Sequence, residues 1–262
     1  MPSDSMQVDR TGPIGWITFN NPARHNAVSL AMWLRLRQLV DELGQDGAIR
    51  VVVVKGAGER AFVSGADISE FSELRSSPET VANYNQAAEA ATEALRLVSK
   101  PTIAMIRGFC IGGGVSVALS CDLRIAAEGS RFGVPAARLG LGYEFNGVRK
   151  LVEVVGPAFA KEIFYTARQF SGEEALAMGL VNRLVPAQRL HDAVHELSES
   201  IAANAPLTVA SIKTLVGEVL KDESERDAAL CERVVDHCFE SEDYVEGRTA
   251  FMQKRAPKFV GR

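Results

Sequence analysis

Two short segments of the chain could hold a negatively charged oxygen with backbone N–H groups. The first is the glycine triplet at residues 112–114, which follows an apolar run and precedes a short helical pattern. The first N–H groups of a helix lack an acceptor inside the helix, and the helix dipole favours negative charge at that end. Taken alone, the triplet is better explained as a tight turn between a strand and a helix.

The second segment, residues 61–71, contains Gly65, Ala66 and Asp67. It also follows an apolar run and leads into a helical pattern, so an N–H group near Ala66 is expected to point outward. Two N–H donors that converge from separate loops suit a thioester enolate, whose oxygen becomes negative only during the reaction. The two segments together therefore predict enolate chemistry better than either segment does alone.

Apolar runs alternate with helical patterns as far as about residue 187. Short β-branched runs indicate strands, while apolar residues three or four positions apart indicate helices. This alternation predicts an α/β fold with largely parallel strands. The expected strands are residues 14–19, 51–54, 102–106, 123–127 and 181–185.

After residue 187 the strand signals stop and four helical patterns follow. Their apolar faces need a cover, which either the rest of the chain or a sister subunit would supply. The expected helices are residues 188–203, 207–220, 223–239 and 243–254.

Composition excludes several classes of partner. The net charge of −4 and the lack of a long basic run argue against nucleic acid or an anionic membrane as a partner. No apolar stretch approaches the length that crosses a bilayer, and the polar residues 1–10 lack a signal core, so a cytoplasmic protein is expected. The scattered cysteines form no CxxC pair and no zinc pattern; they are expected to be reduced thiols, Cys110, Cys121, Cys231 and Cys238.

A series of segments, in order along residues 12–262, resembles the enoyl-CoA hydratase/isomerase (crotonase) superfamily. Asn-Pro-Ala-Arg-His-Asn-Ala resembles the family's first CoA-binding loop, and the segment around Gly-Ala-Asp resembles its second. The combination is specific for the family, although not for one reaction. The segments are residues 21–27, 62–71, 108–126, 132–135 with 139–140, 174–181 and 241–255.

The resemblance implies the crotonase (ClpP/crotonase-like) fold, a spiral of ββα units with a helical C-terminal region. We therefore expect a disordered tail at residues 1–11, a crotonase core at residues 12–187 and a helical trimerisation region at residues 188–262. The family assembles as trimers, often paired into hexamers, so a homotrimer or a dimer of trimers is expected.

The resemblance also assigns site residues. Ala66 and Gly113 would be the N–H donors of an oxyanion hole, and an acyl-CoA or enoyl-CoA thioester would be the substrate. Coenzyme A would enter as part of this substrate, without a metal or a separate cofactor. Phe251 and Lys254 would reach the nucleotide end of CoA, in a neighbouring subunit. The residues implied in CoA binding are Ala23, Arg24, His25, Ala66, Asp67, Ile68, Phe251 and Lys254.

The chain departs from the hydratase pattern at two positions. Hydratases of the family use two glutamates to hold and deprotonate water and to deliver a proton. The corresponding positions here are Ser116 and Ala136. Neither side chain is a base near neutral pH, so ordinary two-glutamate hydration is not expected.

Tyr143 and Glu144 are the candidate replacements. Dienoyl-CoA isomerases and chlorobenzoyl-CoA dehalogenase carry an aspartate at the position of Glu144, and methylmalonyl-CoA decarboxylase carries a tyrosine at that of Tyr143. Apolar surroundings would favour proton uptake by Glu144 and suit it to act as a base. Alternatively, Glu144 begins a helix and complements its dipole. Asp67 is expected to cap the following helix rather than to act as a base.

We therefore expect an enzyme, a lyase or isomerase of acyl-CoA thioesters, that works through an enolate held by an oxyanion hole. Single-base chemistry is favoured, namely isomerisation, hydrolysis or decarboxylation, in the breakdown of fatty, aromatic or branched acids. The alternative is a non-catalytic acyl-CoA-binding or assembly subunit, because both hydratase glutamates are missing.

Overall fold

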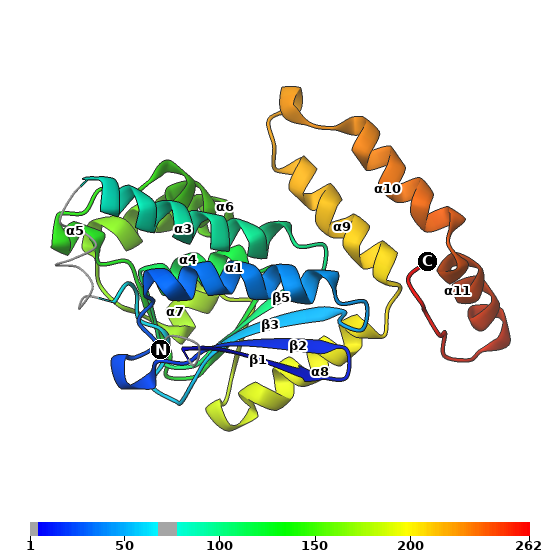
Figure 1. Cartoon of the computed structure of the whole chain (residues 1–262), viewed down its shortest axis with the longest axis horizontal. Coiled ribbons are helices and arrows are strands. Elements are labelled where there is room, and N and C mark those ends of the chain that lie inside the picture. Colours follow the sequence, from blue (N-terminus) through cyan, green and yellow to red (C-terminus); the bar gives the residue numbers. More distant parts are fainter. Residues whose placement is uncertain (1–4, 68–77) are drawn as a thin grey trace.

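A six-stranded sheet forms the centre of the computed structural model, which describes residues 5–67 and 78–262 (Figure 1). Neighbouring strands are parallel, except for the antiparallel pair β1 and β2. In the order in which they lie in the sheet, the strands are β1 (Met6–Thr11), β2 (Ile14–Phe19), β3 (Val51–Gly56), β5 (Thr102–Ile106), β7 (Leu123–Ala127) and β10 (Arg183–Val185).

A second sheet of four short strands lies beside the first. The pairs β3–β4, β5–β6 and β7–β8 each give one strand to each sheet before the chain enters its next described helix. This is the expected ββα repeat, and it confirms the predicted α/β fold. The strands of the second sheet are β4 (Ala61–Val63), β6 (Phe109–Ile111), β8 (Arg131–Gly133) and β9 (Phe170–Ser171).

Helices cover both faces of the six-stranded sheet. Successive side chains of a strand point to opposite faces, so Val52 and Val54 pack towards α1, whereas Val51 and Val53 pack towards α8. A strand buried on both faces reads as a continuous apolar run, which explains the four valines of β3. The helices of the core are α1 (Leu30–Gln45), α3 (Pro78–Leu97), α4 (Gly113–Ser120), α5 (Ala136–Leu139), α6 (Phe145–Thr166), α7 (Gly172–Ala177) and α8 (Leu190–Ala202).

The N-terminal segment corrects the expectation of a disordered tail over residues 1–11. From Met6 to Thr11 the chain forms β1, which pairs with β2 through six residue pairs. Gly12 adopts a φ of 55°, a left-handed conformation that suits the tight turn between the two strands. Only Met6 of this strand is buried, which is why its apolar pattern is weak.

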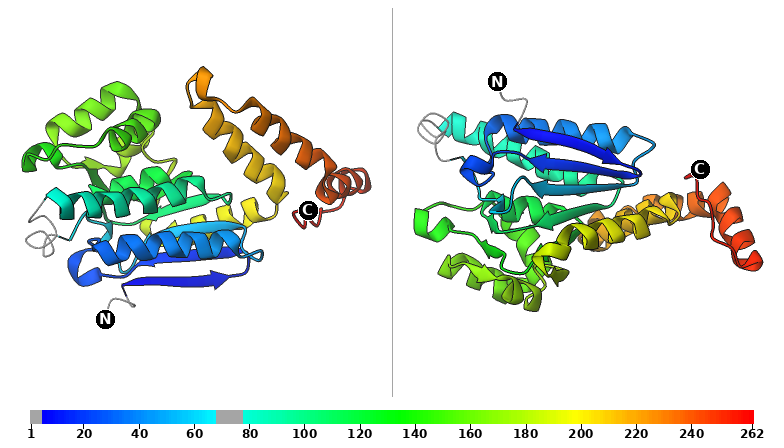
Figure 2. Two further views of the ribbon diagram at one scale, coloured as in Figure 1. Left: turned by 45° about the horizontal axis from the view of Figure 1, so that its top comes forward. Right: turned by 90° about the horizontal axis from the view of Figure 1, so that it is seen from below.

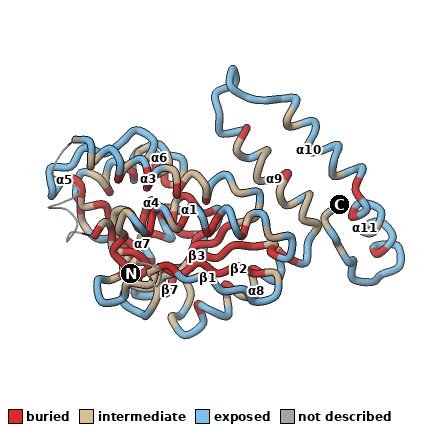
Figure 3. Tube along the Cα trace, in the orientation of Figure 1, coloured by how far each residue is buried: buried red, intermediate tan, exposed pale blue. Residues whose placement is uncertain are grey.

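Three helices extend away from the core at the end of the chain (Figures 1 and 2). They are α9 (Pro206–Val219), α10 (Ala228–Glu240) and α11 (Glu242–Gln253). Most of their surface is exposed, and α10 has no buried residue (Figure 3). The exposed apolar side chains on them include Ile212, Val216, Val219, Val235, Phe239, Val245, Phe251 and Met252.

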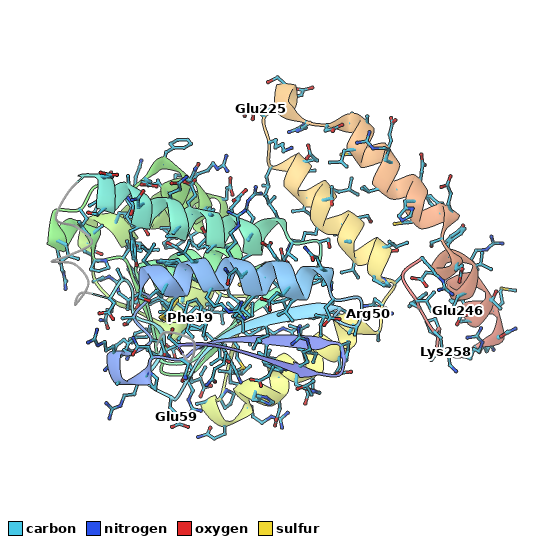
Figure 4. All side chains as sticks on the ribbon, in the orientation of Figure 1. Phe19, Arg50, Glu59, Glu225, Glu246 and Lys258 are labelled. Carbon is cyan, nitrogen blue, oxygen red and sulfur yellow. The ribbon has the colours of Figure 1, made fainter. Side chains whose placement is uncertain are left out.

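Polar contacts attach α9 and the C-terminal segment to the core, and one of them is the hydrogen bond from Lys213 Nζ to the Lys100 carbonyl at 3.1 Å. Lys213 Nζ lies 2.9 Å from Asp122 Oδ2. Arg50, which lies beside the C-terminal segment (Figure 4), donates from Nη2 to the Phe259 carbonyl at 2.7 Å. None of the helices that the structure describes is long and apolar enough to cross a membrane.

Candidate active site

Ala66 is held by a single parallel bridge to Val28. The Val28 N–H donates to the Gly65 carbonyl at 2.8 Å, and the Asp67 N–H donates to the Val28 carbonyl at 3.1 Å. These bonds use the residues on either side of Ala66. The N–H of Ala66 itself therefore points away from Val28 and is available to a ligand.

Gly113 is the first residue of α4, so its N–H belongs to the helix turn that lacks internal acceptors. Gly112 precedes it with a φ of 54°, and the Gly112 N–H donates to the Gly133 carbonyl at 2.9 Å. That bond fixes the turn between β6 and α4. The triplet thus forms the strand-to-helix turn predicted for it and also presents an N–H at a helix start.

The two donors are close neighbours. A Cβ atom on Gly113 would lie 3.8 Å from the carbonyl carbon of Gly65, which is bonded to the Ala66 nitrogen. A Cβ atom on Gly114 would lie 2.1 Å from the Val63 carbonyl oxygen, so only glycine lets α4 approach β4 this closely. The structure therefore brings Ala66 and Gly113 together, as an oxyanion hole requires.

An ion pair joins the two loops that were expected to bind CoA. Arg24 Nη1 contacts both carboxylate oxygens of Asp67, at 3.0 and 2.8 Å. Asp67 is only 8% exposed, and Ser64 Oγ donates to the Arg24 carbonyl at 3.4 Å. The Asp67 carboxylate thus forms an ion pair with Arg24. The helix that Asp67 was expected to cap, and the CoA-binding candidate Ile68, lie outside the described residues.

Asn26 organises the first of these loops, a role that the sequence did not reveal. Its buried amide donates to the carbonyls of Ala57 and Ala61, at 3.0 and 2.7 Å, and accepts from the Asn21 N–H at 2.9 Å. A pocket of about 220 Å³ lies next to it, lined by Pro22, His25, Asn26 and residues 57–61. Ala23 and His25 belong to the same loop, so the structure brings the first CoA-binding candidates to the edge of the Ala66 segment.

Tyr143 lies within hydrogen-bond reach of Ser116, which is one turn along α4 from Gly113. The Tyr143 and Ser116 hydroxyl oxygens are 3.3 Å apart, and the Tyr143 ring packs edge-on against Phe164. Burial raises the pKa of Tyr143, while the Ser116 hydrogen bond opposes the shift. Because 36% of the residue stays exposed, solvent limits the size of this shift. The phenol is therefore neutral near pH 7 and can donate a proton.

Glu144 begins α6 at its N-cap, as the dipole interpretation predicts, but its side chain makes no capping bond. Oε1 instead accepts a hydrogen bond from Asn85 Nδ2, on α3, at 2.8 Å. Glu144 is exposed, so the apolar surroundings expected for it are absent from the described structure. Asn85 was missed because nothing in its sequence context points to Glu144.

The remaining candidate residues lie in two separate parts of the structure. Ala136 is buried at the start of α5. Phe251 and Lys254 lie at the other end of the molecule from the Ala66 segment, on or directly after α11, and Phe251 is 82% exposed (Figures 1 and 2). They do not meet the rest of the site within one chain. No group of three or more metal-binding side chains occurs among the residues that the structure describes.

Comparisons with known proteins give consistent results. The family model for enoyl-CoA hydratase/isomerase matches residues 9–262. A short-chain-enoyl-CoA hydratase of Clostridium acetobutylicum is 32% identical over 97% of each chain. A carnitinyl-CoA dehydratase of Salmonella typhi is 32% identical over 99% of this chain and 100% of the other. The crystal structure of an enoyl-CoA hydratase/carnithine racemase from Magnetospirillum magneticum superposes with a TM-score of 0.93 at 35% identity, covering 99% of this chain and 96% of that one.

Proposed function

Because the chain belongs to the enoyl-CoA hydratase/isomerase family, we propose that it converts an acyl-CoA or enoyl-CoA thioester through an enolate intermediate. The adjacency of the Ala66 and Gly113 N–H groups carries this proposal. Coenzyme A enters as part of the substrate, and no further cofactor takes part. The loops that contain Arg24 and Asp67 bind the CoA portion.

The oxyanion hole acts mainly on the transition state. When a proton leaves the carbon next to the thioester, the electron pair moves onto the carbonyl oxygen, which then meets two fixed N–H donors. Fixed donors need no reorientation during the reaction, and the loss of one such donor typically lowers kcat by about 100- to 1000-fold. Free thioester gains less from them, because its oxygen carries only a partial charge.

Glu144 acts as the single base in this proposal. Its carboxylate removes a proton from the carbon next to the thioester, and the resulting carboxylic acid returns that proton to another carbon of the enolate. The double bond moves and the composition of the substrate is unchanged. Support comes from the chain itself, since Ser116 and Ala136 stand where two-glutamate hydratases are expected to carry carboxylates. Hydrolysis and decarboxylation are the other single-base outcomes.

Tyr143 supplies a neutral hydrogen-bond donor beside the enolate. A protonated phenol paired with Ser116 can hold a substrate carboxylate or deliver a proton, but it cannot compete with Glu144 as the base. Water addition or loss is a second candidate reaction, because the similar proteins are named hydratases and dehydratases.

A panel of thioesters, read by mass, tests the reaction. Migration of the double bond leaves the mass unchanged, hydration adds one water, decarboxylation removes CO2, and hydrolysis releases free coenzyme A. Uptake of solvent deuterium at the carbon next to the thioester reports an enolate whenever the acid formed on Glu144 exchanges its proton with solvent before returning it. Hydrolysis, which attacks the thioester carbonyl directly, gives no such uptake. Tight binding of the whole panel with neither turnover nor deuterium uptake would instead favour a non-catalytic acyl-CoA-binding or assembly subunit.

The variant Glu144→Gln separates the base from the oxyanion hole. It keeps the size and hydrogen-bonding reach of the side chain but cannot take up a proton, so it should bind acyl-CoA normally and lose turnover. Full activity in this variant would rule out Glu144 as the base. The proposed enolate intermediate and the proposed oxyanion hole would not be affected by that result.

We also propose that residues 188–262 form the contact between subunits, in a homotrimer or a dimer of trimers. Exposed apolar side chains on α9, α10 and α11 support this, because the chain's own core does not cover them. In such an assembly Phe251 and Lys254 would complete the CoA site of a neighbouring subunit. Light scattering on the purified protein tests the assembly, and a monomer at micromolar concentration would contradict it.

A further inference from the structure

Two adjacent residues of α3 contact the two halves of the candidate site. Buried Tyr84 donates from its hydroxyl to the Val28 carbonyl at 2.9 Å, and this same carbonyl accepts the Asp67 N–H beside Ala66. Half-buried Asn85 donates to Glu144. One turn of a single helix thus ties the segment that carries an oxyanion donor to the segment that carries the carboxylate.

The hydrogen bond between Asn85 and Glu144 suits a carboxylate that accepts a proton. An ionised carboxylate can only accept hydrogen bonds, so the amide nitrogen of Asn85 is the atom that faces it. The bond occupies Oε1 at 2.8 Å, whereas Oε2 makes no hydrogen bond to the described part of the chain. One oxygen is therefore held, and in the proposed function Oε2 takes up the substrate proton.

Without this bond the Glu144 side chain would have little to fix its orientation. It is exposed, and it makes no capping bond to α6. A free glutamate side chain samples many rotamers, and holding it in one of them before reaction removes an entropic cost from the rate-determining step.

We propose that Asn85 is a positioning residue that fixes the Glu144 carboxylate relative to the oxyanion hole. The inference rests on the proposed function of Glu144 as the base. Asn85 touches neither substrate nor reacting atoms; it acts through Glu144. Because Tyr84 links the same helix turn to Val28, α3 sets the separation between the carboxylate and the Ala66 N–H.

The variant Asn85→Asp tests the proposal with almost no change of shape. It replaces the donor by a second carboxylate that repels Glu144. With 3-hexenoyl-CoA as the probe, deuterium uptake next to the thioester should slow about tenfold, equivalent to about 1.4 kcal/mol in the barrier. KM for the probe should stay within about twofold, because the CoA contacts are untouched. Asn85→Gln keeps an amide donor and should recover part of the loss.

A second amide–carboxylate bond between the same helices provides a matched control. Asn146 Nδ2, on α6, donates to Glu89 Oε1, on α3, and this side-chain hydrogen bond does not involve Glu144. Asn146→Asp makes the same chemical change in the same pair of helices. If Asn85 acts through Glu144, Asn146→Asp should take up deuterium as fast as the native protein. Its melting temperature should nevertheless change by as much as that of Asn85→Asp.

The outcomes separate this inference from the proposed function. Two results would mean that Asn85 only links two helices. One is equal slowing by both aspartate variants, and the other is no slowing by Asn85→Asp while Glu144→Gln is inactive. In either case the role of Asn85 would be wrong, while the proposed function would be unaffected. Normal deuterium uptake by Glu144→Gln would remove the base itself, and the inference with it. Slowing by Asn85→Asp alone, with KM unchanged, would support it.

Discussion

The hydroxyl oxygens of Tyr143 and Ser116 lie 3.3 Å apart, and Ser116 is one helical turn beyond Gly113, the proposed oxyanion donor. A neutral pair of hydroxyl groups thus occupies the place beside α4 where a hydratase is expected to carry a carboxylate. A carboxylate there would repel the enolate oxygen, whereas a hydroxyl donor would stabilise it. In the proposed function, this pair of hydroxyl groups supports enolate formation rather than the activation of water.

Replacing Tyr143 by phenylalanine should slow turnover without disturbing the fold. The ring keeps its contact with Phe164 while the hydroxyl is lost. If the phenol donates to the reacting group, kcat should fall at least about tenfold with KM nearly unchanged. Tyr165→Phe is the control, because Tyr165 is 75% exposed. Equal kcat values for the two variants would contradict a role for Tyr143.

The same phenol predicts a pH dependence. Burial raises the pKa of Tyr143, so the folded protein holds this proton more tightly than the unfolded chain does. Its contribution to stability is therefore complete below about pH 10 and is lost as the pH rises through the folded pKa. Rates of the native protein should fall in that alkaline range through loss of the donor, and Tyr143→Phe should lack this decline.

Replacement by alanine should change the stability of the protein differently at Gly113 and at Gly114. A Cβ atom on Gly114 would lie 2.1 Å from the Val63 carbonyl oxygen, whereas one on Gly113 would approach no nearer than 3.5 Å, to Trp33. Gly114→Ala must push α4 away from β4 and should lower the free energy of unfolding by about 1–3 kcal/mol or more. Gly113→Ala should fold with nearly native stability. Equal melting temperatures would show that α4 can shift freely.

Much of the larger sheet could be predicted from the sequence. The strands β2, β5 and β7 have the bounds expected for them, because short, largely apolar runs mark strands that are buried on both faces. The second sheet was not predicted. Its strands are two or three residues long, too short to show a period, and they pair with partners far along the chain.

Part of the candidate site could likewise be predicted from the sequence, and part of it could not. Ala66 and Gly113 could be proposed because backbone donors depend on local turns and glycines, which leave a mark in the sequence. The contact between Asn85 and Glu144 spans 59 residues and joins a half-buried position of α3 to the exposed N-cap of α6, so no local sequence pattern predicts it. The exposure of Glu144 was missed for the same reason, since burial depends on how α3 and α6 are placed.

The ion pair between Arg24 and Asp67 should contribute to substrate binding as well as to stability. The Arg24 side chain is 55% exposed but that of Asp67 only 9%, so removing Arg24 leaves a buried carboxylate without this cation and should cost about 1–3 kcal/mol of folding free energy. The pair nevertheless joins the two CoA loops beside Ala66, and Arg24→Ala should raise KM for acyl-CoA several-fold. A double-mutant cycle with Asp67→Asn measures the coupling, and additive effects on KM would mean that the pair does not hold the loops together.

Two of the four cysteines should resist alkylation in the native protein. Cys110 and Cys121 are buried. Burial raises the pKa of both thiols, that of Cys121 to about 12, so the reactive thiolate is scarce. At about pH 8, where a free cysteine reacts readily, iodoacetamide should label these two residues only after unfolding. Their labelling in the folded protein would indicate that the core opens around α4.

Crotonyl-CoA tests the departure from the hydratase pattern most directly. Syn or anti addition of water needs one group to hold and deprotonate the water and another to protonate the neighbouring carbon. Ser116 and Ala136 supply no carboxylate, and the exposed carboxylate of Glu144 is one group rather than two. Hydration should therefore be at least about 100-fold slower than with a two-glutamate hydratase assayed in parallel, the least that one acid–base group typically contributes. Deuterium uptake from 3-hexenoyl-CoA should remain rapid, since it needs one base and the oxyanion hole. Fast, stereospecific hydration of crotonyl-CoA would show that water addition does not need the two missing glutamates, and the single-base proposal would then fail.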